Sequence, residues 1–425
     1  MIQVRRIENP KGVWRSAGNS DNFHVTLMRL PYDDAEDFKP FNSEGAWSAT
    51  IVEGGDDFIT LRSTVEGSGS DNAQQTGVKS IEGAGEHPID FWIDFKGTIA
   101  ENSTPRCAIV RVRYHNYTCE HDIYVRQGYA PITIDGNAES DKNPAWASYN
   151  VYCFDANNAP VYTKSPLEEG SLFRRGNRTA ILASNNDRPG FTFGLGPSGS
   201  FDVLELGATT PSQKTWSQLA PSADDVKSRF ASWSIAGDHE RIATIEDFYT
   251  LESTSIHSNI GKAYGVLYGD GATETQKSVE VALGYDHNED PTNSKKGMRG
   301  CFVFNINNSH NIFFPIGKSG YGRRKGMTSN GEKVGTLRYA QRTDYYNNDG
   351  TGNIQYVPLF YDLFERPGAI YQCRNRLEST NNEVKNSSAF DINYFTMGFE
   401  GFENGASNNN NGSDSDACFI RTVKY

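Results

Sequence analysis

The sequence predicts a mainly β protein with a few helices, long enough for two or three domains. The apolar segments are short, and many alternate with polar residues at the period of two that is typical of strands. Glycine, asparagine and proline separate them, and the 425-residue chain contains 41 glycines. Aromatic residues, which favour strands, make up 12% of the chain, while long helical periodicities are scarce.

The first 134 residues predict an immunoglobulin-like β-sandwich. In residues 22–30 the side chains of Phe23, Val25 and Leu27 alternate with those of His24 and Thr26, as in a strand of a half-buried sheet. Similar strands are expected at residues 47–52, 58–62, 89–95, 106–114 and 122–128. About seven short strands at this spacing are typical of a sandwich.

Two turns connect predicted strands of this domain. A Gly/Asp turn at residues 54–57 separates strands 47–52 and 58–62. A second turn at His115-Asn116 joins strands 106–114 and 122–128. In the first of these strands we expect Arg111 and Arg113 to face outward and Val110 and Val112 to face inward. Residues 66–87 are rich in small polar residues and predict a loop.

A polar segment at residues 135–144 predicts a linker, and residues 145–425 a second domain. This domain opens with a strand at 145–154. Apolar spacing predicts helices at 222–236 and 244–251. Thr244 suits the N-cap of the second helix, and Asp247 stands where a capping box prefers glutamate. Further strands are expected at 261–268, 279–285, 301–307, 311–317, 390–397 and 417–425.

Three pieces of the first domain resemble the BACON-like immunoglobulin modules of Bacteroidetes surface proteins. They are Trp47, the Arg-x-Ala-x-Val-x-Val strand at 106–112 and the Ile-x-Val-x-Gln-Gly segment at 123–128. The resemblance implies a spacer module or, in some proteins, a carbohydrate-binding unit. Fold similarity alone says little about function.

Four motifs of the second domain, in order, resemble the C-type-lectin-like domain of Fibrobacter succinogenes major paralogous type, found in Bacteroidetes and Fibrobacter surface proteins. They are Thr244-Ile-Glu-Asp-Phe-Tyr-Thr-Leu251, Phe313-Phe-Pro-Ile-Gly-Lys-Ser-Gly-Tyr-Gly-Arg323, Gly335-Thr-Leu-Arg-Tyr-Ala340 and Phe419-Ile-Arg-Thr-Val-Lys424. The family pattern has Trp-Ser-Ser where this chain has Arg338-Tyr-Ala-Gln, and a cysteine where it has Thr422. The resemblance covers roughly residues 240–425 and implies an α+β C-type-lectin-like fold.

The charge of the chain excludes some partners. With 41 basic and 53 acidic residues the net charge is −12, which argues against nucleic acid or an anionic membrane as a bulk partner. No apolar run approaches the 18 or so residues that span a bilayer. Met1 is followed at once by domain-like sequence, so we expect a removed leader upstream, with a lipid anchor or pilus attachment, and a secreted or outer-surface location.

The six cysteines, at positions 107, 119, 153, 301, 373 and 418, form no Cys-x-x-Cys motif and no metal-ligand spacing with histidine. An even number permits disulfides, and buried free thiols are the alternative. Cys107 and Cys119 stand at opposite ends of the predicted hairpin, which argues against their pairing.

No cofactor and no metal are predicted. The calcium-dependent sugar site of C-type lectins needs a Glu-Pro-Asn or Gln-Pro-Asp tripeptide and a Trp-Asn-Asp strand, and the chain has neither. Residues 404–416 offer many oxygen ligands but no calcium-loop register. No nucleophile elbow or selected carboxylate pair indicates catalysis, so the sequence predicts a protein that is not an enzyme.

Aromatic residues in polar loops are the candidate ligand-binding residues. Tyr345 and Tyr346 precede an Asn/Asp/Gly run, Tyr321 lies beside Arg323, and Asn404 opens the last loop. Flat rings beside amide and charged groups stack on sugars or anchor partners, although they also pack beneath loops.

Together these features predict a non-catalytic surface adhesion protein, a fimbrial tip or accessory subunit. Its expected partners are a host or bacterial glycan or protein and other pilus subunits. Three alternatives stay open. They are a glycan-binding lipoprotein of a polysaccharide-utilisation system, an enzyme of formylglycine-generating type, and a structural pilin that exchanges an N-terminal strand.

Overall fold

A computed structural model describes the chain in residues 10–29, 39–63, 75–85, 88–140, 142–168, 170–174, 177–182, 200–215, 217–219, 239–251, 259–271, 297–315, 337–338, 370–372, 389–393, 398–401 and 416–425. Strands make up 51% of these residues and helices 2%. The mainly β fold class is therefore confirmed. The chain forms two compact units, the first from residues 1–137 and 258–313, the second from 138–257 and 314–425.

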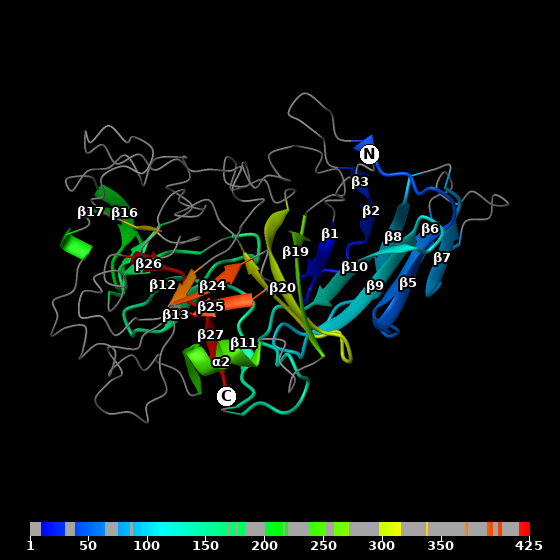
Figure 1. Ribbon diagram of the computed structural model, residues 1–425. Coiled ribbons are helices and arrows are strands. Elements are labelled where there is room, and N and C mark those ends of the chain that lie inside the picture. Colours follow the sequence, from blue (N-terminus) through cyan, green and yellow to red (C-terminus); the bar gives the residue numbers. More distant parts are fainter. Residues whose placement is uncertain are drawn as a thin grey trace, which may run out of the picture. The chain divides into compact units, whose positions relative to one another are not determined.

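The strands of the first unit are β1 (Pro10–Arg15), β2 (Phe23–Thr26), β3 (Met28–Arg29), β4 (Lys39–Pro40), β5 (Trp47–Gly54), β6 (Ile59–Ser63), β7 (Ser80–Gly83), β8 (Asp90–Phe95), β9 (Arg106–Tyr114), β10 (Cys119–Gln127), β19 (Ile260–Tyr268), β20 (Met298–Asn305) and β21 (Asn311–Pro315), whose last two residues belong to the second unit. Most of them form two sheets. One has the order β21-β20-β19-β1-β10-β9-β5-β7 and the other β2-β8-β6 (Figure 1).

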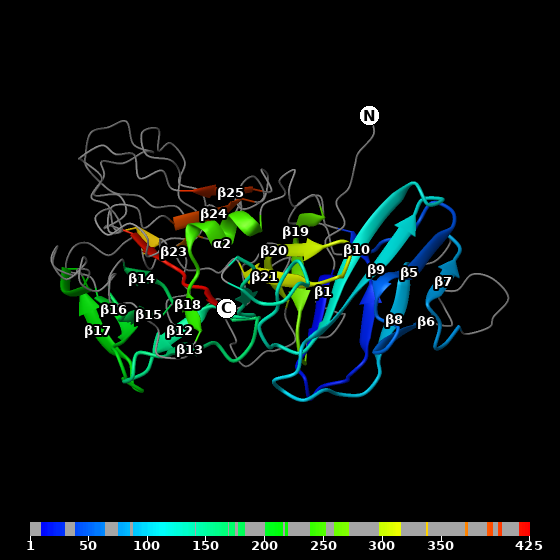
Figure 2. The ribbon, with the colours of Figure 1, turned by 90° about the horizontal axis from the view of Figure 1, so that it is seen from below.

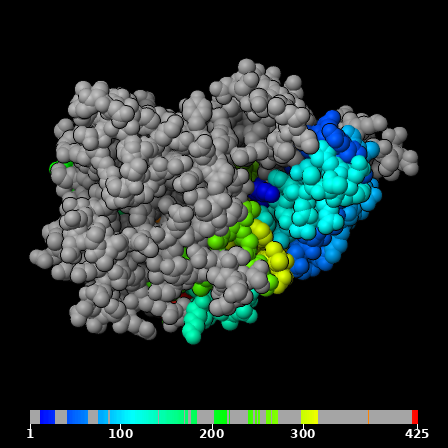
Figure 3. Space-filling view, in the orientation of Figure 1, coloured from blue at the N-terminus to red at the C-terminus, as the bar shows by residue number. Residues whose placement is uncertain are grey.

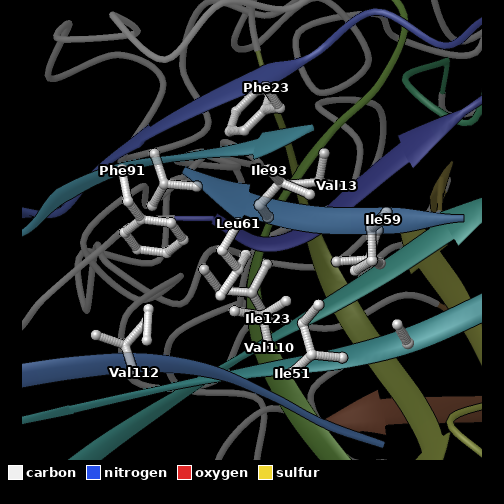
Figure 4. Close-up of a cluster of buried hydrophobic side chains, with 14 of the residues drawn as sticks. Val13, Phe23, Ile51, Ile59, Leu61, Phe91, Ile93, Val110, Val112 and Ile123 are labelled. Carbon is white, nitrogen blue, oxygen red and sulfur yellow. The ribbon is translucent and has the colours of Figure 1, made fainter. Parts of the chain in front are cut away.

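The two sheets enclose one apolar core. Alternate residues of β2, β6 and β8 point inward, among them Phe23, Leu61 and Ile93, and meet Val110 and Ile123 of the larger sheet (Figure 4). All of these side chains are at most 2% exposed. The predicted alternation is confirmed over residues 23–27, because Phe23, Val25 and Leu27 are buried.

The predicted hairpin of β9 and β10 is the longest in the unit, and its strands pair in register from Cys119–Tyr114 to Gln127–Arg106 (Figure 2). Val110 and Val112 face the core as predicted. The sequence predicted the two strands around the Gly/Asp turn but not that they belong to different sheets. β5 pairs with β7 and β9, whereas β6 pairs with β8, so the turn leads from one sheet to the other.

The larger sheet joins distant parts of the chain. β1 pairs in parallel with both β10 and β19, and β19 pairs antiparallel with β20. The strands β19 and β20, which lie within the range 145–425 predicted as a second domain, therefore belong to the same sheet as β1. The first unit's first segment ends at residue 137, and the second unit begins at residue 138. Both positions fall within the predicted linker at 135–144.

The second unit contains short strands in several small sheets. The strands are β11 (Ala145–Trp146), β12 (Val151–Phe154), β13 (Pro160–Tyr162), β14 (Phe173–Arg174), β15 (Ala180–Ile181), β16 (Ser200–Leu204), β17 (Ser212–Thr215), β18 (Glu240–Ile242), β22 (Leu337–Arg338), β23 (Ile370–Gln372), β24 (Ala389–Asn393), β25 (Gly398–Gly401), β26 (Asp416–Cys418) and β27 (Thr422–Lys424). A 3-10 turn, η2 (Ser217–Leu219), and the helix α2 (Ile245–Thr250) accompany them. β27 pairs with both β11 and β18, so the last strand pairs with the first strand of this unit.

The predicted second helix is confirmed as α2. The Asp247 amide donates to Thr244 Oγ1 at 3.2 Å, and the Thr244 amide donates to Asp247 Oδ2 at 2.6 Å, which is a capping box with aspartate in place of glutamate. Phe248 and Leu251 are fully buried. The predicted helix at 222–236 and the strand at 279–285 lie outside the described residues. None of the helices in the described ranges has the length and apolar character needed to cross a bilayer.

Candidate functional site

The predicted ligand-binding residues Tyr321, Arg323, Tyr345, Tyr346 and Asn404 all lie outside the described residues. So does most of the oxygen-rich loop at 404–416. Their role as ligand contacts stays a prediction. The described part of the second unit nevertheless contains portions of all four motifs on which the family resemblance rests.

These four motifs occupy different elements. The first forms α2, the second begins in β21, part of the third is β22, and the fourth leads into β27. β22 pairs with β26, with Leu337 opposite Ala417, so the third motif lies beside the strand that precedes the fourth. Phe248 of the first motif is 6.1 Å from Phe314 of the second, measured between ring centroids.

Arg421 of the fourth motif lies at the centre of this group. Its side chain is fully buried, and its guanidinium carbon is 4.8 Å from the centroid of the Phe314 ring and 5.9 Å from that of Tyr371. Arg421 Nη1 donates to the carbonyl of Ala147, just after β11, at 2.8 Å. Burial lowers the pKa of the Arg421 guanidinium, and the neighbouring Tyr371 hydroxyl opposes this shift.

Further aromatic rings pack against the two rings that lie beside Arg421. Trp146 contacts both Phe248 and Phe314, with centroid distances of 5.0 and 5.9 Å. Tyr371 contacts Phe314 at 5.4 Å and Phe419 at 5.8 Å. The Arg421 cluster, defined as Arg421, Trp146, Phe248, Phe314, Tyr371 and Phe419, is therefore a packed interior that joins three of the four motifs. The rings of the cluster are all buried, so none of them is accessible to a ligand.

A second group of aromatic and charged side chains lies on the outer face of the β2-β8-β6 sheet. His24, Trp92 and Arg62 are neighbours in register on the three strands. The His24 ring stacks on Trp92 at 4.5 Å with an 8° interplanar angle, and the Arg62 guanidinium carbon is 4.7 Å from the Trp92 centroid. Asp94 accepts two hydrogen bonds from Arg62, at 2.8 and 2.9 Å, and a carboxylate oxygen of Asp90 contacts Nε2 of His24.

The row of His24, Trp92 and Arg62 can bind only some kinds of ligand. A histidine from one strand and an arginine from the other flank the indole of Trp92. A sugar that stacks on an aromatic side chain requires a free ring face. The row can therefore offer polar edges to a ligand but no stacking platform for a sugar ring.

Two exposed tyrosines are better candidates for contacts with a partner. Tyr117, in the turn between β9 and β10, is 45% exposed, and Tyr425, after β27, is 39% exposed. The Arg241 guanidinium carbon is 5.2 Å from the Tyr425 centroid. Sequence reasoning placed a turn at His115-Asn116 but overlooked Tyr117. Its position in a polar turn, the criterion that selected Tyr345, would have identified it.

Three of the four cysteines whose side chains are described do not resemble reactive thiols. Cys107, Cys119, Cys153 and Cys301 are free, and all except Cys119 are buried. Burial raises the pKa of Cys107 and Cys153, and it raises that of Cys301 to about 12. Cys107 and Cys119 lie at opposite ends of the β9–β10 hairpin, as predicted. Within the described ranges no three His, Cys, Asp or Glu side chains gather as metal ligands would.

No protein-family model matches this chain, and a comparison with curated proteins finds no match either.

Proposed function

We propose that this chain is a non-catalytic cell-surface adhesion protein, of the kind that forms a fimbrial tip or accessory subunit. Its second unit is the recognition domain, of C-type-lectin-like type, and its first unit is a sandwich module that supports it. The ligand is a glycan or a protein on a host or bacterial surface.

The observation that carries this proposal is the assembly of the four motifs. The motifs are separated by up to about 170 residues along the chain, yet Phe248, Phe314 and Arg421 pack in one cluster. Motifs that matched a family pattern by chance would have no reason to share one interior. Their convergence supports a common fold with the surface proteins that they resemble, and hence the adhesive role.

The first unit supports the same assignment. The pieces that resemble BACON-like modules are Trp47 and the strands β9 and β10. Trp47 is 1% exposed and packs against Phe91, with ring centroids 6.3 Å apart. These pieces belong to the sandwich core, which suits a module that spaces and supports a binding domain.

A glycan array probed with the intact chain, with calcium and again with chelator, tests the proposal. We expect calcium-independent binding to a defined set of glycans or, with a silent array, binding to intact host or bacterial cells. The matched variants are Tyr117→Ala and Val52→Ala. Both variants remove an exposed side chain of the first unit, because Tyr117 is 45% exposed and Val52 is 42% exposed.

The outcomes separate the alternatives. Cell binding that neither variant weakens assigns recognition to the second unit, as proposed, whereas loss of binding in Tyr117→Ala alone assigns it to the first unit. Strictly calcium-dependent binding would point to the loop at 404–416. A chain that binds neither glycans nor cells contradicts an adhesive function.

A further inference from the structure

The turn between β9 and β10 has an unusual backbone. His115, Asn116 and Tyr117 all have positive φ angles, of 52°, 53° and 65°. For residues other than glycine, this left-handed conformation costs roughly 1–2 kcal/mol per residue. Three consecutive residues keep this conformation only where neighbouring groups compensate.

The compensation comes from the turn at residues 43–46. The His115 amide donates to Ser43 Oγ at 2.8 Å, and the Asn116 amide donates to the Ala46 carbonyl at 3.1 Å. The Ala46 amide donates back to Asn116 Oδ1 at 3.1 Å. Gly45 has a φ of 88°, and a side chain there would overlap the Asn116 amide group. Each turn therefore fixes the other.

One of these contacts depends on protonation. The Glu44 amide donates a hydrogen bond to Nδ1 of His115, at 2.8 Å. A backbone N–H can only donate, so Nδ1 must carry a lone pair and the imidazole must be neutral. Protonation places a hydrogen on Nδ1. Two donors then face each other, and the bond is lost.

We propose that His115 is a pH-sensitive latch between the two turns. When it is neutral, it holds the β9–β10 turn in its left-handed conformation and fixes Tyr117 at the surface. When it is protonated, it loses the Glu44 bond and loosens both turns. The side chain of Tyr117 then loses its fixed position while the strands of the hairpin stay paired.

The groups around His115 fit this behaviour. The rings of Phe41 and Tyr114 contact its imidazole, with centroid distances of 5.3 and 5.1 Å. Two titratable residues lie beside it, Glu44, whose amide donates to the ring, and Tyr114, whose ring contacts it, and Cys119 faces Tyr114 across the ladder. Burial raises the pKa of Tyr114, which keeps its hydroxyl neutral throughout the range in which histidine titrates.

Hydrogen exchange of the intact chain, read by mass spectrometry on peptides covering residues 43–46 and 115–118, tests the latch. The comparison runs from about pH 7.5 to about pH 5, where a histidine changes charge, with rates corrected for intrinsic exchange. We expect protection of both peptides to fall about 10-fold on acidification, the effect of losing one or two hydrogen bonds. Peptides from the middle of β9 and β10 should keep their protection.

The matched variant is His115→Asn. Asparagine tolerates a left-handed φ and offers an amide oxygen near the position of Nδ1, but it does not titrate in this range. Protection in His115→Asn should therefore not change with pH. Equal acid-induced loss in this variant would assign the effect to another group, and pH-independent protection in the wild-type chain would likewise overturn the proposal.

Discussion

Phe304 of β20 stacks on Tyr124 of β10, although the strands β19 and β1 lie between β20 and β10 in the sheet. The ring centroids are 4.3 Å apart and the ring planes differ by 25°. Neighbouring strands are about 4.8 Å apart, so the two backbones are separated by about three such spacings. The rings meet because Gly12 of β1 and Gly261 of β19 have no side chains, and the rings of Phe302 and Phe304 lie over them.

This arrangement predicts the effect of adding one methyl group. In Gly12→Ala the new Cβ would overlap the ring of Phe302, which is fully buried and packs against Phe313 at 4.7 Å. We expect the free energy of unfolding, measured with urea, to fall by about 1–3 kcal/mol. Gly18→Ala is the control, because a Cβ there meets nothing within 4 Å. Equal stability of the two variants would contradict the close packing of Phe302 over Gly12.

Replacing Arg126 should reduce the free energy of unfolding by more than Gly12→Ala does. Arg126 is fully buried beside Trp14 and donates to the carbonyls of Gly128, Asn311 and Ala130 at 3.0, 2.7 and 2.6 Å. Arg126→Met leaves these carbonyls without their donor, and we expect a loss of about 3 kcal/mol or more in urea unfolding.

Arg113→Met is the matched control. Arg113 lies in the same hairpin, is half exposed, and pairs with Glu120 at 3.6 Å. Since exposed ion pairs contribute little, its loss should cost at most about 1 kcal/mol. A similar loss in both variants would mean that the buried hydrogen bonds of Arg126 contribute no more than a surface pair.

The sequence predicted the strands of the first unit well, because a half-buried strand carries its own pattern. The alternation of Phe23, Val25 and Leu27 and of Val110 and Val112 reflects one buried face, which a short stretch of sequence reveals. The same local pattern does not specify the partner of a strand. It could not predict that β19 pairs with β1 across some 250 residues, nor that β5 and β6 join different sheets.

The candidate sites likewise contain local features that the sequence predicts and long-range features that it does not. The capping box of Thr244 and Asp247 was predicted because its residues are three positions apart. The Arg421 cluster was not, because its members come from five separate segments of the chain. An arginine just before a terminal strand gives no local signal that it is buried beside aromatic rings.

The cysteines predict a distinct pattern of chemical labelling. Because only the thiolate reacts, burial protects Cys107, Cys153 and Cys301, while Cys119 is exposed. Iodoacetamide at about pH 8 should modify Cys119 and leave the other three unmodified until the chain is unfolded, as peptide mapping would reveal. Rapid labelling of Cys301 in the folded chain would contradict its burial.

Cys301 also predicts a loss of stability in alkali. Its pKa is raised from 9.0 in the unfolded chain to about 12 in the folded protein. Below pH 9 the thiol is protonated in both states and does not disfavour folding. Above it the unfolded state loses the proton first, so stability should fall between about pH 9 and about pH 12. Cys301→Ser, whose hydroxyl does not titrate there, should show a smaller fall in urea unfolding experiments.

The Arg421 cluster predicts a local effect in the second unit. Arg421→Met removes the donor to the Ala147 carbonyl and the cation beside Phe314 and Tyr371. We expect hydrogen exchange to become about 10-fold faster or more in peptides covering β11, α2 and β23, because each of these elements contributes a ring to the Arg421 cluster. Peptides from β9 and β10, which pack in the core of the first unit, serve as the internal reference.

Lys424→Met is the control, because Lys424 lies in β27, three residues after Arg421, but is exposed. It should leave exchange in β11, α2 and β23 close to that of the wild-type chain. Unchanged exchange in Arg421→Met would mean that the four motifs do not depend on Arg421 for their assembly. The structural argument for a C-type-lectin-like recognition domain would then lose its main support, whereas a selective loss in these three elements would strengthen it.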